Sequence, residues 1–171
     1  MKGFLPDGAW VAVHVCSNME RQVSLSLTER DYESFLPTYR ARRKWCDRTV
    51  DLELPLFRGY LFCRWNNENR YPIVRIPGVI RLVGFGKMPA CIDADEIAAL
   101  QRVVNSEVTS MPWKFVRAGD KVRLTCGVLS GLEGVFVRAS SHDYIVVNIT
   151  LMNRAVAARV DPSQIMPLRG S

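Results

Sequence analysis

The chain has 171 residues, a formal net charge of +6 and 48% hydrophobic residues, which is enough for one ordinary domain or two small ones with buried cores. The basic excess favours an anionic partner. The sequence has neither the apolar segment of a secretory signal nor a run long enough to span a membrane. We therefore expect a cytoplasmic protein with no membrane association.

Cysteine usage points to a reducing compartment. The five cysteines occur singly, with no Cys-x-x-Cys pair, which argues against a disulfide framework or a zinc site. We expect no metal and no cofactor. Cys16, Cys63 and Cys126 stand among strand-like apolar residues, so we expect them in the core.

The first elements are a strand and a helix. Residues 10–15 alternate apolar and small residues as a strand does. Ser17 and Glu20 then have the spacing of a capping box, which predicts a helix that continues to about Arg30. Its apolar stripe has a four-residue spacing, at Met19, Val23 and Leu27.

A basic hairpin is predicted next. Residues 35–44 and 50–64 are rich in β-forming residues and are joined by a short polar segment, so we expect them to pair. Basic residues gather on the arms near the tip, interleaved with Tyr39 and Trp45, and Asp47 is the acid among them: Arg40, Arg42, Arg43, Lys44 and Arg48. Such a pattern is typical of a phosphate-binding surface. A solvated hairpin arm is the alternative.

The next segments complete a first domain. Residues 66–76 are expected to form a short helix that Pro77 and Gly78 end, and residues 79–83 a strand. Asp93 and Glu96 form a second capping box before a helix. The apolar stripe of that helix is Ile97, Leu100, Val103 and Val104. The order β, α, β, β, α, β, α is a ferredoxin-like pattern with an extra helix, and a linker containing Pro112 follows.

The last third has glycines between two alternating strands. Residues 119–136, GDKVRLTCGVLSGLEGVF, place Gly127, Gly131 and Gly134 around the turn, where positive φ or a close backbone approach calls for glycine. Further strands are expected at residues 144–150, 155–160 and 164–168. Five short strands in so short a segment predict a small barrel, and the glycine-rich stretch resembles the KOW motif.

The first domain resembles the NGN domain of the NusG family, in which an NGN domain precedes a KOW domain. The resemblance lies in Trp10 and its strand, in ERDYESFLPTYR, PLFRGYLF, PGVIRLVGFG and MPACIDADEIAAL. It implies an α+β chain with a ferredoxin-like NGN domain and a five-stranded KOW β-barrel. The expected divisions are an NGN-like domain at 1–108, a linker at 109–116 and a KOW domain at 117–171.

The resemblance also implies partners and sites. NusG proteins bind the clamp helices of bacterial RNA polymerase through the NGN domain and lie across the DNA cleft. The residues expected at the polymerase are Trp10, His14, Phe57, Gly59, Tyr60, Ile80 and Leu82. Core packing is the alternative role for Trp10 and Leu82. Arg58 stands where the family has proline, which adds a charge beside the expected pocket.

Two further contacts are expected from the resemblance. The basic hairpin would touch DNA near the upstream fork or the non-template strand. The KOW loop would contact a ribosomal protein of the small subunit or the termination factor Rho. The residues expected there are Ile149, Leu151, Met152 and Arg154.

The predicted function is therefore a monomeric, non-enzymatic elongation factor that reduces pausing or termination. The compact basic hairpin favours an operon-specialised antiterminator of the RfaH, UpxY or LoaP kind over the general factor. A ribosome-associated or RNA-binding KOW protein is the alternative. An enzyme is disfavoured because His14 and His142, the only histidines, fall in different predicted domains without triad partners.

Overall fold

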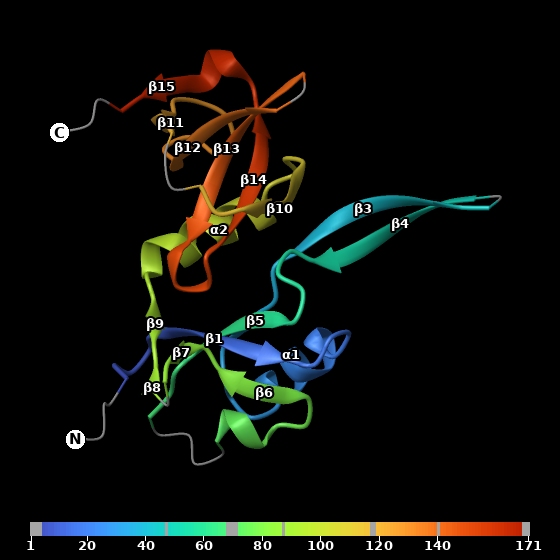
Figure 1. Cartoon of the computed structure of the whole chain (residues 1–171), viewed down its shortest axis with the longest axis vertical. Helices are drawn as coiled ribbons and strands as arrows, with labels where there is room; N and C mark the ends of the chain where they lie inside the picture. The colour runs from blue at the N-terminus through green and yellow to red at the C-terminus, as the bar shows by residue number, and fades with distance from the viewer. Residues whose placement is uncertain are drawn as a thin grey trace. The chain divides into compact units, whose positions relative to one another are not determined.

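The computed structural model of the chain (Figure 1) describes residues 5–46, 48–67, 72–86, 88–116, 119–139 and 141–168. Two compact units divide it. The first contains Met1–Pro37 and Phe57–Ala94, and the second contains Thr38–Leu56 and Asp95–Ser171. Both units mix strands with helix, so the expectation of an α+β chain holds.

The first unit is built on an antiparallel sheet with the strand order β2-β5-β1-β6, and β9 also pairs with β1. These strands are β1 (Trp10–Val15), β2 (Ser34–Phe35), β5 (Tyr60–Arg64), β6 (Val79–Leu82) and β9 (Cys91–Ile92). A separate two-stranded hairpin consists of β7 (Gly84–Phe85) and β8 (Met88–Pro89). The strand expected at residues 10–15 is confirmed as β1.

The alternation in β1 places its valines in a core on one side of the sheet. Val11, Val13 and Val15 pack in one buried cluster with Val23 and Leu27 of helix α1 (Glu20–Thr28). The stripe predicted for this helix is therefore confirmed. Because successive side chains of a strand point to opposite faces, Trp10 and Ala12 lie on the other side of the sheet.

The predicted capping box does not form. Helix α1 begins at Glu20 after an N-cap at Met19, and no side chain caps it. The Glu20 side chain is instead 4% exposed and accepts a hydrogen bond from the backbone N–H of Gly59. A tertiary contact has thus replaced the local one that the spacing predicted.

In the described residues of the segment 66–76, a 3-10 turn takes the place of the expected helix. A single 3-10 turn, η1 (Ile73–Arg75), forms there, and residues 68–71 lie outside the described part. Ile73 and Ile76 are buried. Within the described residues the α-helices are α1 and α2 (Ala94–Asn105). The predicted stripe of α2 is buried at Ile97, Leu100 and Val103, whereas Val104 is half-buried.

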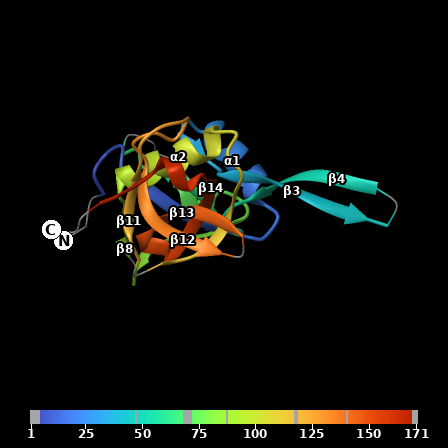
Figure 2. The same cartoon turned by 90° about the horizontal axis from the view of Figure 1, so that it is seen from above.

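The second unit contains the predicted hairpin. Strand β3 (Thr38–Trp45) pairs with β4 (Arg48–Pro55) along its whole length, as Figures 1 and 2 show. The second arm ends earlier than predicted, because a turn at residues 56–59 separates β4 from β5. Pro55 therefore stands at the end of a strand, where a missing N–H donor costs little.

Besides the hairpin and helix α2, the second unit contains a six-stranded antiparallel sheet with the order β10-β14-β13-β12-β11-β15. Its strands are β10 (Ser110–Lys114), β11 (Lys121–Leu124), β12 (Glu133–Ala139), β13 (His142–Ile149), β14 (Arg154–Val160) and β15 (Ile165–Pro167). The five strands predicted from sequence are all present. The segment expected as a linker, residues 109–116, contains strand β10, which pairs with β14.

The glycines of the predicted turn have the expected roles. Gly127 and Gly131 both have a φ of +81°, a conformation that favours glycine. Gly134 has ordinary φ, but a Cβ there would lie 2.6 Å from the carbonyl oxygen of Val146. It therefore permits the close approach of β12 and β13.

The cysteine expectation is right for one residue of three. Cys63 is fully buried in the core beside α1, and burial raises the pKa of its thiol to about 12. Cys16 and Cys126 are exposed. Cys16 follows the last residue of β1, and Cys126 lies in the loop after β11, so neither takes part in a strand as their apolar neighbours suggested.

Candidate functional site

Aromatic side chains pack together on the second face of the first sheet, where Phe57 and Phe62 are buried and Phe35 is half-buried. Phe62 stacks on Phe35 with ring centroids 6.1 Å apart and meets Phe57 edge-on at 5.6 Å. Trp10 meets Phe35 edge-on at 6.4 Å. The exposed fraction of the side chain is 5% for Trp10 and 1% for Phe57. The structure thus brings these two candidate residues into one cluster through Phe35 and Phe62, which the sequence analysis did not single out.

A polar side chain supports the turn beside this cluster. The buried carboxylate of Glu20 accepts a hydrogen bond of 2.8 Å from Gly59, whose φ is +78°. Tyr60 follows and stacks on His14, with centroids 4.7 Å apart and planes 14° apart. Arg58, in the same turn, is exposed. The turn therefore presents the Arg58 guanidinium to solvent, while the hydrogen bond from Gly59 to Glu20 anchors its backbone.

The candidate residues of β6 differ in accessibility. Ile80 is 52% exposed, whereas Leu82 packs against the core beside α1. Nearby in sequence, Phe85 and Met88 face each other across the β7–β8 hairpin and are 76% and 48% exposed. Neighbouring exposed apolar side chains of this kind are a feature that can mark an interaction surface. In the sequence, these two residues are marked only by their apolar character in the segment that follows Gly84.

The basic hairpin has two unlike faces, which the strand register defines. Residues directly opposite each other on paired strands share a face. One face carries Arg40, Arg42 and Lys44, opposite Glu53, Asp51 and Thr49. The other carries Tyr39, Ala41 and Arg43, opposite Leu54, Leu52 and Val50, and Arg48 lies opposite Trp45, whose side chain is outside the described residues. The five basic residues predicted as one patch are therefore divided between two faces.

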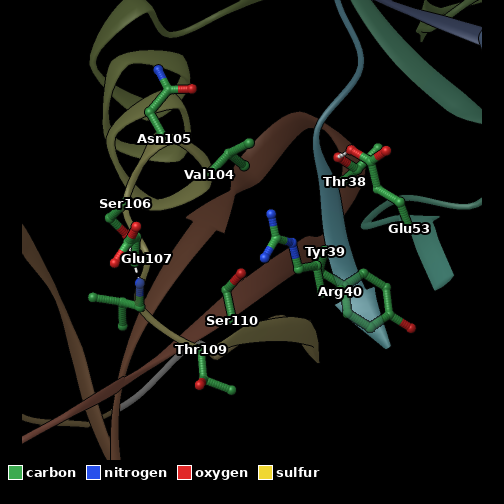
Figure 3. Close-up of a pocket in the computed structure, with 11 residues that line it drawn as sticks. Thr38, Tyr39, Arg40, Glu53, Val104, Asn105, Ser106, Glu107, Thr109 and Ser110 are labelled. Atoms are coloured by element: carbon green, nitrogen blue, oxygen red, sulfur yellow. Dashed lines mark hydrogen bonds between the residues drawn. The ribbon is translucent and has the colours of Figure 1, made fainter. Parts of the chain in front are cut away.

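A solvent-open hollow lies at the base of this hairpin (Figure 3). Its volume is about 680 Å³. It is lined by the first residues of β3 and by the segment that leads from α2 to β10. Arg40, Glu53 and Glu107 are among its lining residues. The charge of Arg40 therefore lies in surroundings that also contain carboxylates.

The loop between β13 and β14 is the last candidate site. Ile149 is fully buried, so it is a core residue, whereas Leu151 and Met152 are half-buried in the 3-10 turn η2 (Thr150–Met152). Asn153 follows with a φ of +52° and Arg154 is exposed. The carboxylate of Glu96 accepts hydrogen bonds from the N–H and hydroxyl of Thr150. Glu96 thus ties helix α2 to this loop through Thr150.

The described residues include neither a metal-binding cluster nor a helix that could span a membrane. No group of three or more His, Cys, Asp or Glu side chains among them is placed to hold a metal ion. None of the helices in the described part of the chain is both long enough and apolar enough to cross a bilayer.

A family model and solved structures of known proteins match this chain. A family model described as NusG, transcription termination factor, matches residues 8–101. A solved structure concerning domain interaction in Thermotoga maritima NusG is similar with 20% identity and a TM-score of 0.56, covering 94% of this chain and 97% of that one. A crystal structure of an MjSpt4:Spt5 complex matches at 12% identity and a TM-score of 0.33, over 93% and 96% of the two chains. No curated protein matches.

Proposed function

The chain belongs to the NusG family, whose model covers more than half of it, and from this premise we propose that it is an elongation factor that binds bacterial RNA polymerase. The proposed polymerase-binding part is a ferredoxin-like NGN domain, residues 1–108. The proposed partner-recruiting part is a KOW barrel, residues 117–171. Such a factor needs no catalytic group, because binding one conformation of polymerase more tightly than another shifts its pausing equilibrium.

The family match is the observation that carries this proposal, and the accessible side chains refine its docking surface. A protein partner contacts exposed groups, and aromatic side chains and Met are enriched in such interfaces. Phe57 and Trp10 are buried, so we propose that they shape the surface from beneath. Ile80, Tyr60, Phe85 and Met88 are accessible and are proposed to touch the clamp helices, with His14 behind Tyr60.

The basic hairpin is proposed to contact DNA near the upstream fork or the non-template strand. Its support is the local excess of arginine and lysine at the strands β3 and β4 and the electrostatic attraction of phosphates for such side chains. The loop with Leu151, Met152 and Arg154 is proposed to bind a ribosomal small-subunit protein or Rho. Its support is the half-exposed pair of apolar side chains at its tip.

Reduced pausing or termination is the proposed outcome, as for an operon-specialised antiterminator. The compact hairpin with opposed faces supports the specialised type, because a surface of defined composition can discriminate among nucleic acids. We propose that the factor acts as a cytoplasmic monomer.

The test is transcription by bacterial RNA polymerase on templates with a pause and a terminator. Wild type is expected to shorten the pause or raise read-through. The double variant Phe85→Ser with Met88→Ser is expected to lose this effect, and Leu25→Ser is the control, because Leu25 is 66% exposed on helix α1. No effect of wild type on any template, together with sedimentation with ribosomes, would overturn the proposal in favour of a ribosome-associated protein.

A further inference from the structure

The turn that leads into β5 places an arginine at a position suited to proline. The backbone N–H of Tyr60 donates to the carbonyl oxygen of Phe57 at 2.9 Å, so Arg58 and Gly59 are the central residues of a β-turn. Gly59 has a φ of +78°, and Arg58 is not among the residues with positive φ. This combination is typical of a type II turn, which favours proline at its second position. Arg58 occupies that position.

The turn is held by contacts that do not use the Arg58 side chain. The N–H of Gly59 donates to the Glu20 carboxylate at 2.8 Å, and the carbonyl oxygen of Gly59 accepts a hydrogen bond of 2.9 Å from Val15. Phe57 is buried on the other side of Arg58. The fold therefore does not need arginine here, and it forgoes the restriction of the unfolded chain that proline would supply.

The guanidinium of Arg58 has no acidic partner in the described part of the chain. Arg58 is exposed, and none of the salt bridges between described residues includes it. By contrast, Arg64 of the same unit lies 3.4 Å from the carboxylate of Glu33. Glu20, the acid beside the turn, is buried and bound to Gly59. The turn thus presents a positive charge that these residues do not neutralise.

The surface next to the turn has the composition of a protein interface. Strand register places Arg81 opposite His14, and His14 opposite Tyr60, so these three side chains share a face of the sheet. Arg81 is exposed, and none of the salt bridges between described residues includes it. Its neighbour Ile80 is 52% exposed. Arginine and aromatic side chains are enriched in protein interfaces and among the residues that dominate their binding energy.

We propose that Arg58 binds a carboxylate side chain of the polymerase segment that docks on this surface. The inference rests on the proposed function and names the chemistry that the polymerase must offer at this point. A guanidinium can donate two parallel hydrogen bonds to one carboxylate, and a fixed turn presents it in a defined place. A nucleic-acid backbone would call for a cluster of cations, whereas the aromatic and apolar neighbours of Arg58 fit a protein.

The test separates the role of Arg58 in binding from its role in the fold. Arg58→Pro supplies the residue that the turn favours, and Arg58→Gln removes the charge without restricting the backbone. Arg21→Gln is the matched control, because Arg21 is exposed on α1, which covers the opposite face of the sheet. Affinity of the full chain for bacterial RNA polymerase is measured by fluorescence anisotropy at roughly 50 and 300 mM salt. Thermal unfolding is followed in parallel.

The expected results for Arg58→Pro have opposite signs. Its unfolding midpoint should rise by roughly 1–4 °C, because proline restricts the unfolded chain. Its affinity for polymerase should fall about fivefold at the lower salt concentration, and Arg58→Gln should lose as much. Both losses should shrink at the higher salt concentration, since salt screens an exposed ion pair. Arg21→Gln should stay within about twofold of wild type.

Several results would overturn the inference. Wild-type affinity in Arg58→Gln would do so, as would an equal loss in Arg21→Gln or a loss that does not change with salt. Weaker binding of Arg58→Gln to a DNA duplex, with unchanged affinity for polymerase, would assign the arginine to nucleic acid instead. In each of these cases wild type still binds polymerase, so the proposed function stands. A wild type that does not bind polymerase removes the proposed function itself, and the inference with it.

Discussion

The carboxylate of Glu20 accepts a hydrogen bond of 2.8 Å from the backbone N–H of Gly59, and both groups are buried. The contact joins the first turn of α1 to the turn that carries Phe57 and Arg58. The glycine that ends the turn has a positive φ, and its N–H points at this carboxylate. The side chain that supports the candidate polymerase surface is therefore on a helix outside that surface.

Glu20→Ala is expected to lower the free energy of unfolding by about 1–3 kcal/mol, because it leaves the buried Gly59 N–H without its acceptor. Glu20→Gln keeps an acceptor oxygen and should lose less. Gln22→Ala is the control, since Gln22 is exposed on the same helix. Urea unfolding measures all three, and identical midpoints for wild type and Glu20→Ala would contradict the role.

Glu20 also shows where prediction from sequence stops. The spacing of Ser17 and Glu20 predicted the position of the helix to within its first turns, and periodicity predicted the buried stripe. The sequence pattern could not show that the Glu20 carboxylate would accept a hydrogen bond from Gly59, 39 positions away. Local spacing carries no information on tertiary partners. Glu96 likewise has a partner far along the chain, because its carboxylate accepts a hydrogen bond from the N–H of Thr150.

The division of the basic patch was hidden for a related reason. Composition identified Arg40, Arg43 and Arg48 as one cluster, but which face each takes depends on strand register. A shift of one residue would exchange the faces. Likewise the burial of Phe57 and the exposure of Phe85 follow from packing, which the family resemblance did not specify.

Gly134 offers a test of the close approach between β12 and β13. In Gly134→Ala the new Cβ would lie 2.6 Å from the Val146 carbonyl oxygen and 2.7 Å from Ile145 Cγ1, so backbone must shift. We expect a loss of about 1–3 kcal/mol of unfolding free energy. Val128→Ala is the control, because the Val128 side chain is 75% exposed, and it should change the unfolding free energy little. A stable Gly134→Ala protein would show that the sheet can widen there without cost.

The cysteines should differ in reactivity. Cys16, Cys46, Cys91 and Cys126 are exposed, whereas Cys63 is buried with its pKa raised to about 12. Only a thiolate reacts readily, so Ellman's reagent at neutral pH should label four thiols in the native protein. The fifth should react when guanidinium unfolds the chain. Rapid modification of all five in the native state would contradict the burial of Cys63.

Asp161 should make the second unit sensitive to acid. Its pKa lies below the ordinary value because the backbone N–H of Ser163, and then its hydroxyl, donate to the carboxylate. Because the pKa of Asp161 is lower in the folded than in the unfolded chain, its ionised carboxylate stabilises the fold in full at a pH above the unfolded-state pKa. This stabilisation is lost as pH falls through the folded pKa.

The measurement is a carboxyl-carbon NMR titration of Asp161 in wild type and in Ser163→Ala. The variant keeps the backbone donor, which is the larger cause, so its pKa should rise only partway towards the ordinary value. The stability difference between wild type and Asp161→Ala should also shrink towards acid. If Asp161 of the wild type titrates at the ordinary pKa of an aspartate, the proposed contribution of this turn to stability against acid is wrong.

Phe57→Ala is expected to lower the stability of the fold, and any loss of polymerase binding is expected to follow from that. The side chain is 1% exposed and meets Phe62 edge-on, so its truncation should cost about 3–5 kcal/mol. That is a large part of the stability of an ordinary domain. Phe57→Leu refills most of the space and should cost less. Thermal unfolding of both variants, alongside polymerase binding at a temperature where both are folded, separates the two effects. Full stability of Phe57→Ala with loss of polymerase binding would show that Phe57 touches the polymerase directly, and not through the turn that it supports.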